Sequence, residues 1–260
     1  QMKLDKKVAI VTGAGRNIGE AIGHAFVAEG ASVALVDVRL DAAQAVANAI
    51  NATNPGRAIA ISADVSSGPA VQEMVAGTVA AFGGVDILVN NAAVTDHTPC
   101  LELEEAEWDL VIDVTLKGVF LCVKYAGRQM RDQGRGGRII NIASTSGHRG
   151  RADATAYSAA KGGVLNLTRS LAIQMSPYGV RVNSITPNRV GSPVGQETIP
   201  QTGREVSNLV GRQGMPPDIA AAAVFLASDE ADFIAAADLL VDGGSLAGGM
   251  PFSTQGPAAK

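Results

Sequence analysis

Short apolar runs alternate with amphipathic stretches from one end of the chain to the other. Residues 8–11 are apolar throughout, and apolar residues between Ile18 and Phe26 then recur at helical spacing until Gly30. A short continuous apolar run is typical of a buried strand, whereas a period of three to four residues indicates an amphipathic helix. The chain therefore begins as a strand followed by a helix, and the same alternation continues to its far end.

The alternation predicts about seven strands with helices between them. Strands are expected at 8–11, 31–36, 58–62, 85–90, 138–143, 180–185 and 239–241, and helices at 18–29, 41–49, 66–82, 104–133, 153–175 and 217–227. Asp41 is the expected N-cap of the second helix. Strands that are apolar throughout need cover on both faces, which an alternating strand–helix chain provides. We predict an α/β fold with a doubly wound parallel β-sheet, formed by residues 1–260 as a single domain.

One long segment, residues 188–215, has neither period. It contains 28 residues, and loops longer than about 12–15 residues are uncommon unless they have a function. Because the segment joins two elements of the same domain, we interpret it as a lid over the substrate site in preference to a solvated linker.

The composition predicts a soluble globular protein and excludes several other classes. Hydrophobic residues make up 47% of the 260 positions and charged residues 18%, with a net charge of −4. Such a chain can build a core, and it has no general attraction for nucleic acid or an anionic membrane. No apolar run reaches about 18 residues and no signal peptide is recognisable, so we expect a cytoplasmic protein. Cys100 and Cys122 are expected to be reduced packing residues, and no metal-binding motif is present.

A glycine-rich turn, TGAGRNIG at residues 12–19, lies between the first strand and the first helix. Glycine lets the backbone approach a pyrophosphate closely, and the helix N-terminus offers free N–H groups and a partial positive charge. The turn alone is weak evidence, but its place between a strand and an amphipathic helix is the one that the mechanism requires. The predicted phosphate-binding residues are Gly13, Gly15, Arg16, Asn17, Ile18 and Gly19.

A carboxylate ends the second strand. Asp37 follows the last glycine of the turn by 18 residues, near the spacing expected for a group that binds the adenosine ribose hydroxyls. A carboxylate there repels a 2′-phosphate, which favours NAD over NADP. Arg16 and Arg39 are the counter-evidence, since either side chain could approach a 2′-phosphate.

Tyr157 and Lys161 are four residues apart in an expected helix and therefore share one face. A phenol has an ordinary pKa near 10 and is a poor acid–base group at neutral pH. A neighbouring ammonium and a bound nicotinamide cation would favour the phenolate. Ser144, at the end of the preceding strand, could donate a hydrogen bond to a substrate oxygen. These three residues are the candidate catalytic groups.

Several motifs together resemble the short-chain dehydrogenase/reductase family. They are the glycine turn, Asn90-Asn91-Ala92-Ala93, Asn141-Ile142-Ala143-Ser144, Tyr157-Ser158-Ala159-Ala160-Lys161 and Val241-Asp242-Gly243-Gly244. They occur in the family's order, and the resemblance runs from about residue 4 to residue 245. It is specific to the family and not to a substrate.

The resemblance implies a seven-stranded Rossmann fold that forms homodimers or homotetramers and binds a small alcohol or ketone. Tyr157 would be the general acid–base, Ser144 would orient the substrate oxygen, and Lys161 would lower the tyrosine pKa and bind the nicotinamide ribose. By the same matching, the remaining cofactor contacts would be Asp64, Val65, Asn91, Pro187, Val190 and Ser192. The candidate substrate contacts at strand ends are Val94, Ser146, His148 and Arg189, and His97 also follows a strand end.

One departure from the family pattern bears on catalysis. Thr115 stands in Val114-Thr115-Leu116, where many relatives have asparagine that helps to hold a water connecting the lysine to solvent. A hydroxyl cannot offer the paired donor and acceptor of an amide, so the role of Thr115 is doubtful. The sequence favours an NAD-dependent oxidoreductase of secondary alcohols and ketones. The alternatives are a dinucleotide-binding regulator or scaffold with little turnover, and an NADP-dependent ketoacyl-thioester reductase.

Overall fold

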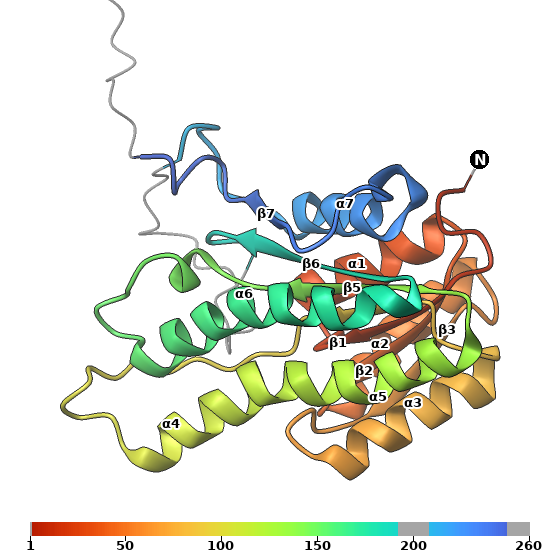
Figure 1. Cartoon of the computed structure of the whole chain (residues 1–260), viewed down its shortest axis with the longest axis horizontal. Coiled ribbons are helices and arrows are strands. Elements are labelled where there is room, and N and C mark those ends of the chain that lie inside the picture. The colour runs from red at the N-terminus through yellow and green to blue at the C-terminus, as the bar shows by residue number, and fades with distance from the viewer. Residues whose placement is uncertain (1, 192–207, 249–260) are drawn as a thin grey trace, which may run out of the picture.

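Seven strands form one parallel sheet in the order β3-β2-β1-β4-β5-β6-β7, in a computed structural model that describes residues 2–191 and 208–248 (Figure 1). The strands are β1 (Val8–Thr12), β2 (Ser32–Asp37), β3 (Ala58–Ser62), β4 (Ile87–Asn90), β5 (Gly137–Ile142), β6 (Val180–Pro187) and β7 (Asp238–Val241). The helices are α1 (Asn17–Ala28), α2 (Leu40–Thr53), α3 (Gly68–Phe82), α4 (Glu105–Ile112), α5 (Gly118–Gln133), α6 (Thr155–Met175) and α7 (Pro216–Ala227). The predicted doubly wound sheet is confirmed.

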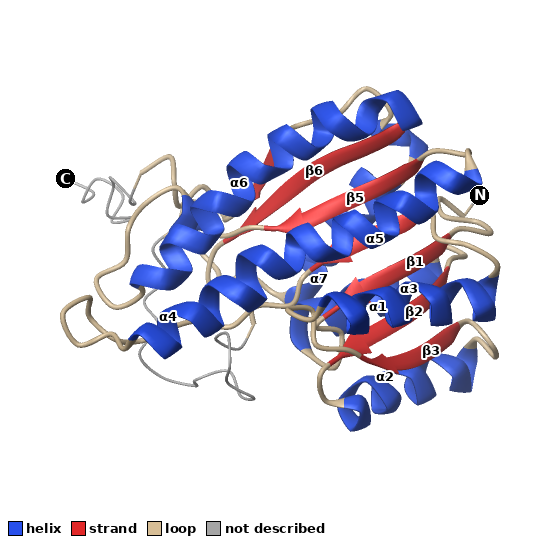
Figure 2. Cartoon of the chain, turned by 60° about the horizontal axis from the view of Figure 1, so that its bottom comes forward, coloured by secondary structure: helices blue, strands red, loops and turns tan. Residues whose placement is uncertain are grey.

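Helices cover both faces of the sheet because consecutive strand residues point to opposite sides. In β1, Ala9 and Val11 belong to a buried cluster with residues of α1, α2 and α7, whereas Ile10 belongs to a second cluster with residues of α3, α5 and α6. Figure 2 shows α5 and α6 lying along one side of the strands, with α3 on that same layer. Two apolar cores, one on each face, therefore hold the sheet rigid.

Most predicted elements lie within a few residues of the observed ones, and the differences concern their ends. Asp41 is not the N-cap of α2, because Arg39 occupies that position. Asp41 lies in the first helical turn, where its negative charge still interacts favourably with the helix dipole. The long helix expected at 104–133 is α4 and α5 joined by a π-helical turn, Asp113–Lys117. Such turns insert an extra residue and occur often at functional sites.

The strand order places a crevice at the carboxyl ends of the central strands. β1 pairs with β2 on one side and with β4 on the other, so the chain winds in opposite directions from the centre. Open α/β sheets bind ligands at the carboxyl ends of the strands beside this reversal. The segments that follow β1, β4, β5 and β6 therefore define where a site can form.

Some expectations concern residues that the structure describes only in part. The expected lid at 188–215 and the expected cofactor contact Ser192 lie largely or wholly outside the described residues, which resume at Asn208. Within residues 2–191 and 208–248, no helix has the length and apolar character needed to span a bilayer. The same residues contain no group of three or more His, Cys, Asp or Glu side chains that could hold a metal ion.

Candidate active site

The glycine turn after β1 is held tightly against the residues that follow β4. Gly13 has a φ of +61°, and a Cβ there would lie 2.9 Å from Ala92 Cα. At Gly19 a Cβ would collide with the carbonyl oxygen of Gly13. Asn91 donates from Nδ2 to the carbonyl oxygens of Thr12 (3.0 Å) and Gly13 (2.9 Å). The Asn91 side chain therefore fixes the shape of the turn, and glycine is required where the backbone packs on itself.

Thr12 is a structural member of this site that the sequence analysis missed. Its hydroxyl accepts hydrogen bonds from the N–H groups of Asn91 (3.0 Å) and Ala92 (3.1 Å) and donates to the carbonyl of Val89 (3.3 Å). These bonds tie the end of β1 to the end of β4, the two strands on either side of the crevice. A buried threonine at the last position of a strand, directly before a glycine turn, is the signal that could have identified it.

Asp37 lies beside the glycine turn at the end of β2. Its carboxylate accepts hydrogen bonds from the backbone N–H groups of Gly15 (3.0 Å) and Arg39 (3.1 Å). It lines a cavity of about 450 Å³ together with Arg16, Asn17 and other residues of the turn. The carboxylate is thus held in one orientation and faces the space where a nucleotide could lie.

Asp64 and Val65 line the same cavity from the segment after β3. The Asp64 carboxylate accepts from the N–H (2.9 Å) and the hydroxyl (2.7 Å) of Ser66, so its position is set by its own turn. Val65 is buried. Together with the exposed side chain of Val38 they form an apolar-edged opening that suits a flat aromatic base.

A second cavity, of about 320 Å³, brings together the three candidate catalytic residues. Ser144 follows β5, and Tyr157 and Lys161 lie one turn apart in α6; all three line this cavity. The nucleotide-side cavity shares Ile18, Asn91, Ala93 and Val190 with it, so the two form one continuous crevice. Pro187, also expected to contact a cofactor, lines the second cavity.

Burial governs the acid–base properties of Tyr157 and Lys161. It raises the pKa of the Tyr157 phenol above its ordinary value of 10, while a hydrogen bond with Ser144 and the positive charge of Arg151 act to lower it. Burial also lowers the pKa of Lys161 to about 7. The Lys161 ammonium donates to the carbonyl oxygen of Ile142 (2.6 Å) and lies 5.6 Å from the centroid of the Tyr157 ring. Lys161 is therefore the group in this pair that can change protonation state near neutral pH.

Asp96, which the sequence analysis did not single out, positions the tyrosine. Its side chain is fully buried, and its two carboxylate oxygens accept from the backbone N–H groups of Ala156 (3.0 Å) and Tyr157 (2.9 Å). These are orphan donors in the first turn of α6, so the carboxylate caps the helix that carries both catalytic candidates. The cap comes from a residue about sixty positions away, which explains why no local pattern indicated it.

Thr115 lies in the π-helical turn and is fully buried. Its hydroxyl donates to the carbonyl of Val94 (2.9 Å) and accepts from the N–H of the same residue (3.1 Å). The side chain thus holds the segment after β4 against the helix. Through the hydroxyl alone, Thr115 satisfies both the backbone donor and the backbone acceptor of Val94.

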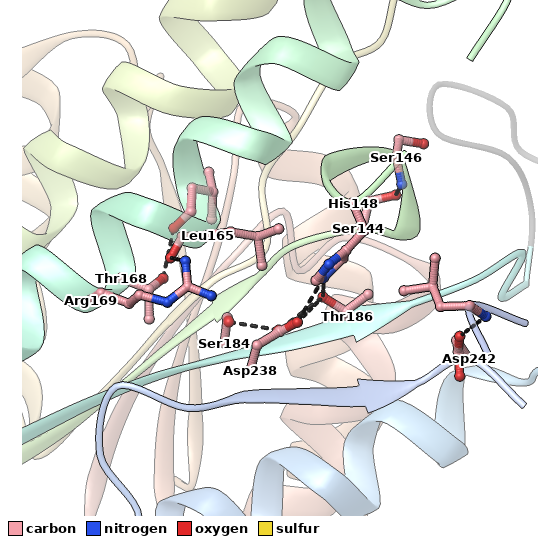
Figure 3. Close-up of polar contacts among 12 residues, drawn as sticks. Ser144, Ser146, His148, Leu165, Thr168, Arg169, Ser184, Thr186, Asp238 and Asp242 are labelled. Atoms are coloured by element: carbon pink, nitrogen blue, oxygen red, sulfur yellow. Dashed lines mark hydrogen bonds and ion pairs between the residues drawn. The ribbon is translucent and has the colours of Figure 1, made fainter. Parts of the chain in front are cut away.

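Three of the four candidate substrate contacts line the crevice, and the fourth, His148, does not. Ser146 and Arg189 line the catalytic cavity, and the Ser146 N–H donates to the Ser144 hydroxyl (3.1 Å). Val94 lines the nucleotide-side cavity. His148 lines neither of the two cavities. Figure 3 shows its ring turned toward Asp238 at the start of β7, and the Nε2–Oδ2 distance is 2.8 Å.

The contacts of Asp238 explain the orientation of His148. The carboxylate also accepts from the hydroxyls of Ser184 (2.7 Å) and Thr186 (2.8 Å) on β6 (Figure 3). His148 therefore ties the loop after Ser144 to the edge of the sheet. A sequence position after a strand end could not distinguish this anchoring contact from a contact with substrate.

Two arginines of the catalytic cavity were also missed. Arg149 and Arg151 follow the short 3-10 turn after Ser144, and both line the cavity with Tyr157. His97, the other histidine at a strand end, lines it as well. The signal in the sequence is the pair of arginines two residues apart in the loop that follows the Ser144 strand.

Comparison with known proteins agrees with this arrangement. A family described as Enoyl-(Acyl carrier protein) reductase matches residues 13–245. The chain is 40% identical over 250 residues to the short-chain dehydrogenase/reductase eriH of Hericium erinaceus, covering 93% of this chain and 98% of that protein. It is 37% identical over 257 residues to a sorbitol dehydrogenase of Cereibacter sphaeroides, covering 94% and 99%.

Among solved structures, levodione reductase superimposes with a TM-score of 0.86 at 34% identity, covering 94% of this chain and 99% of that one. The parallel sheet, the crevice at its carboxyl edge and these matches along nearly the whole chain lead to one conclusion. The chain belongs to the short-chain dehydrogenase/reductase family of nicotinamide-dependent oxidoreductases.

Proposed function

We propose that the protein is an NAD-dependent oxidoreductase that interconverts a secondary alcohol and the corresponding ketone. The observation that carries the proposal is that Ser144, Tyr157 and Lys161 line one cavity, which is continuous with the cavity beside Asp37 and the glycine turn. Hydroxyl, phenol and amine thus lie at one end of a crevice whose other end has the features of a dinucleotide site. The similarity to a sorbitol dehydrogenase supports an alcohol as the substrate.

Three side chains carry out the proton chemistry in this proposal. The bound nicotinamide supplies a carbon that accepts or gives the hydride. Tyr157 exchanges a proton with the substrate oxygen, and Ser144 holds that oxygen by a hydrogen bond. Lys161 has a pKa of about 7, and in its ammonium form it favours the phenolate of Tyr157. In the protein alone burial keeps the phenol protonated, so positive charge in the crevice is what makes Tyr157 a base.

The test is the exchange of Tyr157 for phenylalanine, with NADH formation followed at 340 nm as the assay. Tyr157→Phe removes the exchangeable proton and leaves the ring, so we expect turnover to disappear while NADH binding, measured by fluorescence, stays within about threefold. Tyr178→Phe is the matched control, because Tyr178 is exposed and precedes the amino end of β6, whereas the crevice lies at the carboxyl ends of the strands. Retained turnover in Tyr157→Phe would remove the residue from the acid–base role.

The preference for NAD rests on Asp37. Its carboxylate, fixed by the Gly15 and Arg39 N–H groups, faces the nucleotide-side cavity and would repel a 2′-phosphate. Arg16 also lines that cavity, where its positive charge would act in the opposite direction and attract a 2′-phosphate. We expect Asp37→Ala to shift the ratio of kcat/KM for NAD and NADP toward NADP by at least tenfold. An unchanged ratio would show that Asp37 does not read the ribose.

A non-catalytic dinucleotide-binding protein is the second candidate, and Thr115 is the observation that favours it. The threonine hydroxyl is committed to Val94, so it does not supply an amide beside Lys161. Under this reading, cofactor would bind while no alcohol or ketone in a broad panel changed the NADH absorbance. Turnover that depends on Tyr157 would exclude it.

The proposal includes a homodimer or homotetramer. The side chain of Phe120 on α5 is 45% exposed, and it lines a shallow apolar groove with Leu116 and with Leu167 of α6. A second copy of the chain would remove this apolar surface from water. We expect Phe120→Glu to reduce the molar mass measured by light scattering, and an unchanged mass would place the interface elsewhere.

A further inference from the structure

The catalytic cavity is cationic although the chain as a whole carries a net charge of −4. Among the described residues that line it, the ionisable groups other than Tyr157 are all basic, namely His97, Arg149, Arg151, Lys161 and Arg189. No aspartate or glutamate is among these lining residues. Hydroxyl and amide side chains in the same lining, such as Ser144 and Asn188, can bind the hydroxyl groups of a substrate. The basic side chains add an affinity for anions that a neutral polyol would not use.

Two of these basic residues follow Ser144 closely in the chain. Arg149 and Arg151 both belong to the loop between Ser144 and α6, and both are exposed at the mouth of the cavity. Within the described part of the chain, the Arg149 guanidinium has no ion-pair partner. Arg151 shares Asp153, at 3.1 and 3.3 Å, and His97 lies 3.9 Å from the same carboxylate. The carboxylate of Asp153 therefore offsets the charge of Arg151 and leaves that of Arg149 unpaired among the described residues.

This positive charge reaches the reacting group. Arg151 acts electrostatically on the Tyr157 phenol, in the direction that lowers its pKa. An anion bound by the arginines would therefore lie within electrostatic reach of the phenol.

The cofactor's phosphates do not account for these arginines. The cavity beside the glycine turn is lined by Arg16, Asn17 and Gly13, and neither Arg149 nor Arg151 lines it. A pyrophosphate placed at the N-terminus of α1 would have its donors there. Arg149 and Arg151 lie instead in the loop between Ser144 and Tyr157.

We propose that the substrate is a hydroxy or keto compound with an anionic group, a carboxylate or a phosphate ester, that Arg149 and Arg151 bind while its secondary alcohol meets Tyr157. This inference rests on the proposed function. A guanidinium group binds a carboxylate and a phosphate ester in the same way, by paired hydrogen bonds, so both kinds of substrate fit these arginines. Arg189 lines the same cavity from the segment after β6.

The experiment compares matched substrates with purified enzyme and NAD. For each polyol of three to six carbons, three compounds are assayed separately: the polyol, the corresponding acid in which one terminal carbon is a carboxylate, and the terminal phosphate ester. NADH absorbance is the readout. We expect the anionic members to have kcat/KM values about 10–100-fold higher than their neutral partners, because a charged hydrogen bond contributes that much. We also expect their KM values to rise between 20 and 300 mM salt. The acid and phosphate series identify which source the site prefers.

Variants connect the preference to the named residues. Arg149→Gln and Arg151→Gln should each reduce the anionic-to-neutral ratio of kcat/KM by about tenfold or more. Arg131→Gln is the matched control, since Arg131 is exposed on α5 and paired with Asp132. The ratio should stay unchanged there.

The possible failures are distinguishable. Neutral polyols that are turned over as well as or better than their anionic partners, with dependence on Tyr157, would overturn the anion site and leave the proposed function standing. An unchanged ratio in both arginine variants would overturn the assignment to these residues. No turnover of any compound, while NADH binds, would overturn the proposed function itself.

Discussion

The buried amine of Lys161 makes a prediction about stability that can be measured without any substrate. Lys161 is 3% exposed, and burial lowers its pKa from an ordinary value of 10.5 to about 7. Replacing it by methionine removes the titrating group and keeps an unbranched side chain of similar length. Because every other titration is common to both proteins, the difference in unfolding free energy between wild type and Lys161→Met isolates this one group.

The sign of the effect follows from where the proton is bound. Below pH 7 both the folded protein and the unfolded chain carry the proton, and the folded state bears the full cost of burying a charge. Between pH 7 and 10.5 the folded protein releases the proton while the unfolded chain keeps it, so wild-type stability rises with pH relative to the variant. Over the whole window the unfolding free energy of the wild type rises by roughly 5 kcal/mol relative to that of the variant. Between pH 6 and pH 9 the rise is about 2.5 kcal/mol.

Urea unfolding of the cofactor-free proteins at pH 6 and pH 9, followed by far-ultraviolet circular dichroism, measures this difference. Lys124→Met provides the control, because Lys124 is exposed on α5 and its exchange should shift stability equally at both pH values. A wild-type minus Lys161→Met difference that does not change with pH, or that falls as pH rises, would refute a neutral lysine near pH 8. It would also contradict the assignment of Lys161 as the group of the Tyr157–Lys161 pair that changes protonation state near neutral pH.

Three further substitutions test how the site is held. Asp96→Ala leaves the N–H groups of Ala156 and Tyr157 without their acceptor, so we expect a loss of about 1–3 kcal/mol in unfolding free energy and a lower kcat, with Asp96→Asn closer to wild type. Gly19→Ala should abolish cofactor binding, measured by NADH fluorescence, because the methyl group meets the Gly13 backbone. Gly77→Ala on α3 should not, because a Cβ there would meet Ile61 Cδ1 at 3.5 Å, an ordinary van der Waals contact. His148→Ala should lower kcat with little change in cofactor affinity, because it frees the Ser144 loop from Asp238; an unchanged kcat would contradict that role.

The fold could be predicted from the sequence because its signals are local. A run such as Val8–Val11 is apolar on both faces, and only a sheet covered on both sides can bury it. The ends of the elements were less accurate because distant residues fix them. Helix α6 begins at Thr155 and not at Asp153, since the buried carboxylate of Asp96 reaches Ala156 and Tyr157 and sets the first turn there.

The grouping of the candidate residues could be predicted where local spacing and the ends of strands fix their positions. Tyr157, Lys161 and Ser144 line one cavity because a helical spacing of four and a strand end each have a fixed geometry. Thr12 and Asp96 were missed because they act by hydrogen bonds to the backbone of segments far away in the sequence. Such roles depend on tertiary distances, which residue types and spacing do not contain.

The net charge of the chain does not indicate the charge along the crevice. The carboxylates of Asp37 and Asp64 line its nucleotide end together with Arg16 and Arg39, whereas the ionisable side chains that line the other end are basic apart from Tyr157, Arg149 and Arg151 among them. Coulomb interactions in a partly buried cleft act over several ångströms, so a ligand responds to this local order and not to the total over 260 residues. In the proposals made above, Asp37 at the nucleotide end disfavours a 2′-phosphate on the cofactor, and Arg149 and Arg151 at the other end bind an anionic group of the substrate. On that basis one crevice discriminates against negative charge at one end and selects for it at the other.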